Sequence, residues 1–413
     1  MKKRIAVTGL GAVTPIGIGW KAFWDAAVRG TPGTGPMTLF DNSHYEIKIA
    51  AEVKNFDPAD FMLPQVFRKT DRFAQMGIAA AKMALEDSGL ASRFDPENNS
   101  IPVIIGSGLG GSLFHEEQIF QLIAHGDPRK VLSSSVPRIA PNAVSAYIAM
   151  EHKLRGPNLT ISTACSSGGN AIAVAADYLQ KGISEVVITG GAECPISPFT
   201  YAAYQALRVL SDDKVHGVKT PRPFDISRDG FVLGEAAGIL VLEDYDHAKK
   251  RGAKIYAELA GYGSNCGAFH MAAPDPSGKD AAEAMEAALR MAGAEKEKVG
   301  YINAHGTATK MNDECEAIAI NKVFGSSRAG PWVSSTKSQT GHTIGAAGAI
   351  EAILTVLSIV EGIVPPTIHT EKIDPACPVN LVVKDAVKAK IQYAMSNSFG
   401  FGSNNSVLLF SKV

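Results

Sequence analysis

The stretch "TISTACSSGGN" at residues 160–170 places a lone cysteine, Cys165, between a β-branched run and an apolar run. The run before it is typical of a short buried strand, and residues 170–181 have helical spacing that ends at Gly182. A thiol at such a turn lies near unpaired helix N–H groups, which favour a thiolate and can stabilise a developing oxyanion. The position indicates a nucleophile, although free cysteines also serve as small core residues.

The second half of the chain contains the polar groups that such a nucleophile needs. His305 follows a strand-like run in "YINAHGTAT", and "SSTKSQTGHTIGAAG" presents Lys337 and His342 before an apolar helix. Taken singly, a loop histidine or a lysine near a helix start is usually a surface residue. Because each of these groups ends a strand or begins a helix, we expect them to gather at one edge of the sheets, where α/β folds bind ligands.

The elements that position these residues alternate between strands and helices. Strands are expected at "RIAVTGLG", "IPVIIGSG", "NLTISTA", "EVVITGGAE", "AGILVLEDY", "IYAELAGYGSN", "VGYINAHGT", "PWVSSTKS" and "NSVLLFSKV". Helices are expected at about 70–88, 170–181, 278–293, 313–323 and 345–361. This alternation predicts an α/β fold with parallel-rich sheets covered by helices.

The two halves of the chain resemble each other. Each opens with a strand that ends in Gly-x-Gly, and each later has a small-residue turn before an Ala-rich helix, "TACSSGGNAIAVA" and "TGHTIGAAGAIEA". A duplicated unit explains both features. We place the boundary after residue 252, which gives units at 1–252 and 253–413.

Composition excludes several classes of protein. A net charge of −1 over 413 residues argues against a surface built for nucleic acid. The five cysteines form no C-x-x-C pair, so we expect neither a disulfide framework nor a zinc site, and reduced thiols favour the cytoplasm. The N-terminal run predicts a strand and a loop rather than a secretion signal. The apolar segment near 345–361 carries Glu351 and Glu361, which favours a buried helix over a membrane span.

The stretch "GSGLGG" at 106–111 has the form of a dinucleotide-binding loop after a strand. Such a loop needs an acidic residue at the end of a second strand about 20 residues later. The nearest candidate, Asp127, lies in the turn "HGDPRK" instead. We therefore favour a role of these glycines in close backbone approach to a substrate or to another chain.

Several motifs together resemble one family. "TACSSG", "NAHGTAT", "STKSQTGH" with "GAAGAIE", and "SNSFGFGSNN" are similar to the β-ketoacyl-[acyl-carrier-protein] synthases of the thiolase-like superfamily, especially the synthase II branch. The resemblance extends from "RIAVTGLGAVTPIG" to the final strand. It implies a thiolase-like duplicated α-β-α-β-α five-layer sandwich, a homodimer, and condensation of an acyl primer with malonyl on acyl carrier protein.

The resemblance also implies a role for each site residue. Cys165 would hold the primer as a thioester, and His305 and His342 would donate to the enolate that forms when malonyl loses carbon dioxide. Lys337 would order His342 and Glu351 from behind. The N–H groups of Cys165 and Phe401 would form the oxyanion hole. Phe399 would belong to the gate beside this hole. Thr307, Thr309 and Asp313 would be supporting residues.

Substrate contacts follow from the same resemblance. Leu109 and Tyr204 would line the acyl pocket, with Leu109 gating its deeper end. An acidic carrier protein requires basic residues near the substrate entrance. The expected docking residues are Arg68, Lys69, Arg129, Lys130 and Arg208. No cofactor is expected, because the substrates arrive on the phosphopantetheine arm of the carrier.

The chain departs from the family pattern at five positions. Ala308 and Lys310 stand where family members commonly have serine and proline, Ser403 and Asn404 alter the "GFGGTN" loop, and Ala272 stands where a threonine is usual. These changes put the primer preference in doubt, whereas the catalytic residue types are all present.

Other functions predict other features. A papain-like protease has a similar Cys-to-His interval but a cysteine near its mature N-terminus. A degradative thiolase has a second cysteine where "NSFGFG" stands, and a non-catalytic chain-length subunit lacks the nucleophile. The main alternative is a condensing enzyme of a polyketide, polyene or specialised lipid pathway.

Overall fold

The computed structural model describes residues 3–91, 93, 95, 99–325 and 330–413. Its main sheet contains one five-strand pattern twice. The first unit supplies β1 (Ile5–Thr14), β5 (Val103–Gly106), β6 (Asn158–Ile161), β7 (Val186–Glu193) and β8 (Ala236–Asp244). The second unit supplies β9 (Ala257–Cys266), β10 (Val299–Asn303), β11 (Trp332–Ser334), β14 (Tyr393–Gly400) and β15 (Asn404–Ser411).

Strand order and direction are the same in both units. The orders are β6-β5-β7-β8-β1 and β11-β10-β14-β15-β9, and the antiparallel pair β1 and β9 joins them. In each unit the first three strands of the order are mutually parallel and the last two run antiparallel to their neighbours. The predicted duplication is confirmed, and the expectation of parallel-rich sheets was wrong. The boundary after residue 252 stays a prediction.

The helices occupy corresponding places between these strands. In the first unit they are α1 (Trp20–Val28), α3 (Arg72–Asp87), α4 (Ser112–His125), α6 (Ala143–His152), α7 (Ser167–Gln180), α8 (Pro198–Ala206) and α10 (Tyr245–Lys250). In the second they are α11 (Lys279–Ala292), α12 (Lys310–Phe324) and α14 (Ala347–Glu361). Shorter elements are β2 (Gly17–Ile18), β3 (Gly35–Pro36), β4 (Ile49–Ala50), β12 (Ile363–Val364), β13 (Val387–Lys388), α2 (Pro64–Phe67), α5 (Ser135–Ile139), α9 (Asp213–His216) and α13 (Lys337–Thr340).

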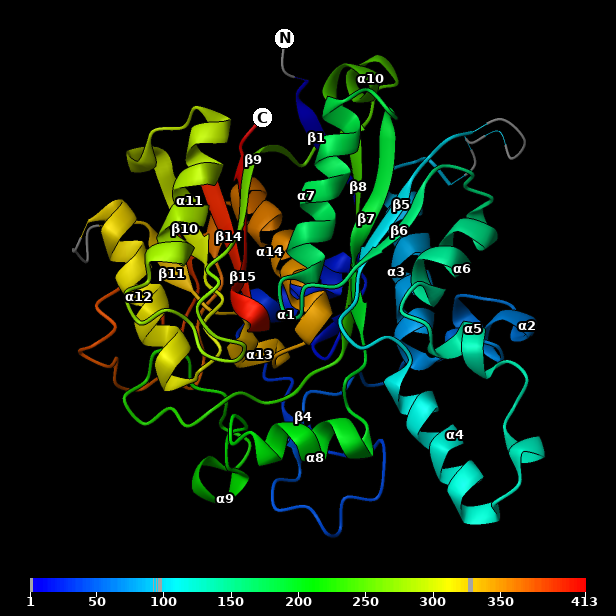
Figure 1. Cartoon of the computed structure of the whole chain (residues 1–413). Coiled ribbons are helices and arrows are strands. Elements are labelled where there is room, and N and C mark those ends of the chain that lie inside the picture. The colour runs from blue at the N-terminus through cyan, green and yellow to red at the C-terminus, as the bar shows by residue number, and fades with distance from the viewer. Residues whose placement is uncertain (1–2, 92, 94, 96–98, 326–329) are drawn as a thin grey trace.

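Helices and strands form five layers. The helices α7 and α14 lie in the middle, where α7 packs on β5 and β7 while α14 packs on β8 and β14 (Figure 1). Helices α3 and α6 cover the outer face of the first unit, and α11 and α12 cover the outer face of the second. The fold is the thiolase-like α-β-α-β-α sandwich that the resemblance implied.

The middle layer is built from small residues. A Cβ on Gly348 of α14 would lie 2.7 Å from the backbone nitrogen of Gly169 in α7, so the two helices touch backbone to backbone. The run Ile344–Glu361 has the length and composition of a membrane span, yet 89% of it is buried inside the protein. It is the interior helix that the sequence predicted.

Candidate active site

Three turns at one end of the sheets bring the predicted residues together. Cys165 lies between β6 and α7, His305 follows β10, and His342 lies between α13 and α14. The Nε2 atom of His342 is 3.1 Å from the Sγ atom of Cys165. The rings of His305 and His342 meet edge to face, with centroids 5.4 Å apart. All three side chains are buried and line one cavity.

The duplication explains why Cys165 and His342 meet. Each residue lies just before the middle-layer helix of its own unit. Cys165 is in the connection that follows β6, and His342 is in the corresponding connection that follows β11. Because α7 and α14 cross closely, their starts face each other. The residue before the cysteine, Ala164, has a positive φ of 51°, a sparsely populated conformation that turns the chain sharply into the helix.

Burial dominates the ionisation of the Cys165 thiol. Removal from water raises its pKa to about 12, although the charge of Lys337 and the backbone N–H groups of Phe401 and Cys165 oppose this rise. The expectation that the helix start favours a thiolate was therefore wrong for the free protein. The same two N–H groups lie close enough to the thiol to lower its pKa, so they are available as donors to an oxyanion that forms beside the sulfur.

Both histidines are neutral at physiological pH. Burial and then the charge of Lys337 lower the pKa values of His305 and His342 well below the usual range of histidine. The Nδ1 atoms of both rings are buried and have no hydrogen-bond partner among the described residues. In His342 it is the other ring nitrogen, Nε2, that contacts the sulfur of Cys165.

Lys337 lies behind the histidines in an ion pair. Its Nζ atom is 2.5 Å from an Oε atom of Glu351, and both side chains are buried. Burial raises the pKa of Glu351 to about 7, opposed by Lys337. Lys337 donates its hydrogen bond to Glu351, and among the described residues it donates none to His342, so its influence on that ring is electrostatic.

Two buried carboxylates hold the loop that carries His305. Glu316 of α12 accepts hydrogen bonds from the backbone N–H groups of His305 (2.8 Å) and Gly306 (2.7 Å). Asp313, which we predicted as a supporting residue, accepts from the N–H of Ala308 (3.2 Å). The sequence reasoning missed Glu316, although a glutamate inside the buried face of a helix was a usable signal.

The threonines of this loop face the cavity. Thr307 and Thr309 both line it, and their hydroxyl oxygens are 3.0 Å apart. Thr309 also caps α12, because its side chain accepts from the N–H of Asn312. The departures Ala308 and Lys310 flank Thr309: Ala308 has a φ of 66°, and Lys310 begins α12.

The "GSGLGG" loop binds a carboxylate of the protein itself. The N–H groups of Gly108 (2.5 Å) and Leu109 (3.1 Å) donate to Glu193, which also accepts from the N–H of Gly345 near the start of α14. This internal use of the N–H groups explains the glycines without a nucleotide. The sequence reasoning missed Glu193, a buried charge at the end of an apolar strand whose pKa burial raises to about 7.

Aromatic and apolar side chains line the cavity around Cys165. Tyr204, Phe231 and Ile344 line it beside Cys165, and Phe399 packs on His305 with centroids 5.7 Å apart. Leu109 does not line this cavity in the single chain, and 38% of its surface is exposed.

Two loops form the mouth of the cavity. Ala272 lies on one loop and Phe401 on the other. The hydroxyl of Ser403 joins them by donating to the carbonyl of His270 (3.1 Å), and the side chain of Asn404 donates to the carbonyl of Phe401 (3.1 Å).

The predicted docking residues lie on the surface. Arg68, Lys69, Arg129, Lys130 and Arg208 are all exposed. Arg129 pairs with Asp127 at 2.9 Å, so part of its charge is already compensated. Within the described ranges, no group of three or more His, Cys, Asp or Glu side chains is arranged to hold a metal ion.

Comparisons with known proteins agree with this geometry. A family model described as "Beta-ketoacyl synthase, N-terminal domain" matches residues 2–248, and one described as "Beta-ketoacyl synthase, C-terminal domain" matches residues 256–371. The chain is 44% identical to 3-oxoacyl-[acyl-carrier-protein] synthase 2 of Vibrio cholerae, with 100% of both chains covered. It is 43% identical to the protein of that name in Staphylococcus aureus, over 99% of this chain and 98% of the other.

Solved structures show the same fold over the whole chain. The ishigamide ketosynthase/chain length factor and a β-ketoacyl synthase from Burkholderia phymatum each superpose with a TM-score of 0.92 at 33% identity, covering 100% of both chains. Sequence relatives, fold and the Cys-His-His geometry point to one conclusion. The chain belongs to the β-ketoacyl synthase family.

Proposed function

We propose that this enzyme is a 3-oxoacyl-[acyl-carrier-protein] synthase of the synthase II kind, which lengthens a fatty acyl chain by two carbons. The observation that carries the proposal is the contact of 3.1 Å between Cys165 and His342, with His305 beside them in one cavity. Full-length relatives at 42–44% identity bear the synthase 2 name, whereas a type II polyketide ketosynthase matches at 31%. We therefore prefer fatty acyl elongation to a polyketide or polyene pathway.

Acyl transfer begins from a neutral pair. The thiol of Cys165 attacks the thioester carbonyl of the primer while its proton passes to Nε2 of His342. The oxyanion that forms accepts hydrogen bonds from the N–H groups of Cys165 and Phe401. When the carbon–sulfur bond to the carrier breaks, the proton goes to the departing pantetheine thiolate and the primer remains on Cys165.

Condensation uses both imidazoles as donors. Loss of carbon dioxide from the malonyl thioester leaves an enolate, whose oxygen accepts hydrogen bonds from the Nε2–H groups of His305 and His342. For His342 this step requires that its single ring proton has moved from Nδ1 to Nε2 after acyl transfer. The enolate carbon then attacks the acyl carbonyl on Cys165, a carbon–carbon bond forms, and the bond to the sulfur breaks. The Cys165 thiolate takes up one proton from solvent, and the 3-oxoacyl product leaves on the carrier.

Neutral imidazoles suit this task, and burial, assisted by the charge behind the rings, favours that state by lowering their pKa values. The positive charge of Lys337 disfavours protonation of both rings, and Glu351 keeps that charge paired. Glu316 and Asp313 fix the loop of His305 by its backbone. The reaction needs no cofactor of its own, because decarboxylation supplies the carbanion.

We assign the acyl end of the cavity to Tyr204 and Phe231, with Leu109 contributing in an assembled dimer. Acyl carrier protein would dock on the exposed arginines and lysines named above; a structurally similar type II polyketide ketosynthase forms a complex with its acyl-carrier protein. The free state of all five cysteines fits the cytoplasm.

Separate measurement of the two half-reactions tests the proposal. His305→Ala and His342→Ala should each reduce malonyl decarboxylation by about 100-fold, the scale of losing one oxyanion donor, while some acylation of Cys165 persists. Equal loss of both half-reactions in His305→Ala would contradict the division of roles.

A further inference from the structure

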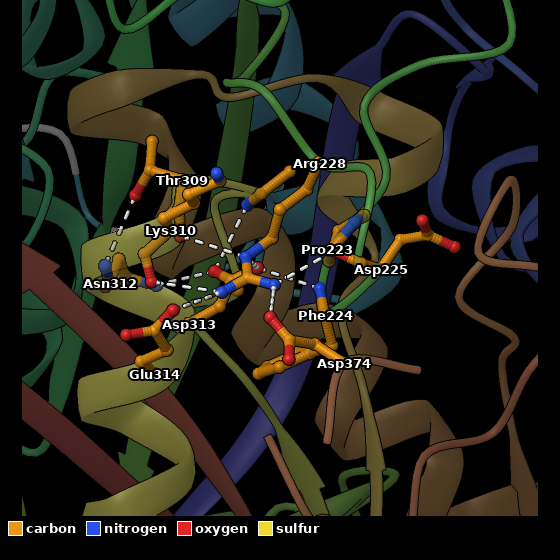
Figure 2. Close-up of polar contacts among 12 residues, drawn as sticks. Pro223, Phe224, Asp225, Arg228, Thr309, Lys310, Asn312, Asp313, Glu314 and Asp374 are labelled. Carbon is orange, nitrogen blue, oxygen red and sulfur yellow. Dashed lines mark hydrogen bonds and ion pairs between the residues drawn. The ribbon is translucent and has the colours of Figure 1, made fainter. Parts of the chain in front are cut away.

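A fully buried arginine lies behind the loop that carries His305. Arg228 belongs to the segment before β8, and only 1% of its surface is exposed. Figure 2 shows its guanidinium among Lys310, Asp313, Glu314 and Asp374. All five of its N–H groups have acceptors: the carbonyls of Thr309 (3.4 Å), Asp225 (2.9 Å) and Lys310 (3.2 Å), and the carboxylates of Asp374 (2.6 Å) and Glu314 (3.2 Å). Two of these carbonyls belong to the end of the His305 loop.

The loop needs such an anchor because its backbone is strained. Gly306 and Ala308 have φ values of 36° and 66°, and Ala308 carries a Cβ that disfavours this conformation. Glu316 holds the first N–H groups of the loop, whereas Arg228 holds its last two carbonyls. The segment in between presents Thr307 to the cavity.

Arg228 also compensates the carboxylate that holds the middle of the loop. Its Nε atom is 3.5 Å from Asp313, and both side chains are fully buried. Asp313 in turn accepts from the N–H of Ala308 (3.2 Å) and from that of Phe224 (2.8 Å). A buried carboxylate without a paired cation loses its charge or its geometry, so the contact to Ala308 depends on Arg228.

We infer that Arg228 is a positioning residue for the malonyl half of the reaction. By holding the carbonyls of residues 309 and 310 and the carboxylate of Asp313, it fixes His305 and Thr307 where the malonyl thioester must bind. The inference rests on the proposed role of His305. Acylation of Cys165 should not depend on Arg228, because Cys165 lies in a different connection, between β6 and α7.

A lysine cannot replace this arginine. Lysine has three donors on a point charge, whereas the guanidinium offers five in a planar fork, and here each one has an acceptor. Arg228→Lys keeps the positive charge beside Asp313 but leaves acceptors in the loop unpaired. The variant therefore separates geometry from charge.

The chain offers a matched control six residues earlier. Arg222 is also buried, and its donors reach the carbonyl of Lys219 (3.1 Å), the hydroxyl of Ser227 (3.3 Å) and the carboxylate of Glu371 (3.4 Å). It braces the same segment as Arg228 but makes no hydrogen bond to the His305 loop. Arg222→Lys therefore reports the cost of disturbing the segment alone.

The test measures both half-reactions in the full-length enzyme. Malonyl decarboxylation is followed by carbon dioxide release, and acylation of Cys165 is followed by intact mass. In Arg228→Lys, decarboxylation should fall at least about 10-fold, while acylation stays within about 2-fold of the parent. Arg222→Lys should change neither by more than about 2-fold.

Parallel losses in both half-reactions, or a loss in Arg222→Lys equal to that in Arg228→Lys, would overturn the inference, since either result indicates a purely structural role. His305→Ala is run beside them: if it retains decarboxylation, the proposed function fails, and if it loses decarboxylation while Arg228→Lys does not, only this inference fails.

Should Arg228→Lys not fold, Asp374→Asn removes one partner of the guanidinium from a partly exposed site. It should lower decarboxylation selectively by a smaller factor, and an unchanged decarboxylation rate would count against the inference.

Discussion

The reactive thiol of this enzyme is neutral, although it lies at the start of a helix. A helix N-terminus offers partial charges, but burial removes the whole hydration shell of a thiolate, and the second effect is larger here. In the proposed mechanism the starting state is therefore the S–H group beside a neutral His342, whose Nε2 lies 3.1 Å from the sulfur.

Alkylation of Cys165 should follow this raised pKa. Because the thiolate is the reactive form and the pKa is about 12, the rate with iodoacetamide should rise about tenfold per pH unit from pH 7 to 9 without a plateau. The rate at the Cys165 peptide is measured by mass spectrometry, with denatured protein as the control. A plateau below pH 8 in the folded enzyme would show a depressed pKa instead.

At the scale of elements, the site depends on how closely the two middle helices cross. The turns before α7 and α14 face each other only because glycines let the helix backbones touch. A Cβ at residue 348 would lie 2.7 Å from the Gly169 nitrogen and 2.8 Å from the hydroxyl of Ser398. This contact sets the distance between Cys165 and His342.

Gly348→Ala should destabilise the protein although alanine is the better helix former. Overpacking of a tight core typically costs about 1–3 kcal/mol, which exceeds the gain of about 1 kcal/mol in helix propensity. Denaturant unfolding measures the change, and Ser358→Ala in the same helix is the control, because that hydroxyl bonds only within its own helix. An unchanged or raised stability of Gly348→Ala would show that the crossing can relax.

Elements with a clear period or an apolar run were predictable from the sequence. Three elements near the site were identified because their residues are almost uniformly apolar or small. They are the strand before His305, the strand before Cys165 and the helix that contains Glu351. Helix α4 was missed because it exposes Phe120 and Ile123 and so lacks a clean polar face. Strand β14 was missed because "YAMSNSFG" contains several buried polar residues.

Buried charges escaped prediction for a different reason. Glu193 bonds to Gly345, and Arg228 bonds to Lys310, so each partner is distant in the sequence. A single chain contains no local signal for such pairing. Glu193 visibly ends an apolar strand, whereas Arg228 stands in the polar segment "FDISRDGF", and the function of both depends on the tertiary arrangement.

At the scale of the whole molecule, one face is unusually apolar for a monomer. Helix α4 exposes Phe120 (68%) and Ile123 (76%), and Val136 and Phe199 on neighbouring elements are exposed as well. Strand β6 ends the sheet on the same side of the molecule (Figure 1). An exposed apolar face beside a free strand edge is typical of an interface, which supports the proposed homodimer.

Phe120→Glu combined with Ile123→Glu should therefore yield monomers. The charges would have to be buried without partners, which disfavours association by several kcal/mol. Light scattering after gel filtration measures the mass, and Ile318→Glu on α12, at the outer face of the other unit, is the control. A doubly substituted protein that remains dimeric would place the interface elsewhere.

Carrier docking is a second property of the surface. Arg129→Glu with Lys130→Glu should raise the apparent KM for carrier-bound substrate about 10-fold at low salt and leave free pantetheine thioesters unaffected, because only the carrier is acidic. Lys249→Glu with Lys250→Glu on α10, at the opposite end of the molecule, is the charge-matched control (Figure 1). Equal effects on both substrate types would argue against docking at this site.

The central claim is that Cys165 carries the growing chain. The enzyme is incubated with an acyl carrier thioester, and malonyl on its carrier is then added to half of the sample. Both halves are digested, and mass spectrometry gives the mass of each cysteine peptide. We expect an acyl adduct on Cys165 alone, which disappears with malonyl as a 3-oxoacyl product two carbons longer appears. An adduct on another cysteine, or one on Cys165 that malonyl does not discharge, would contradict it.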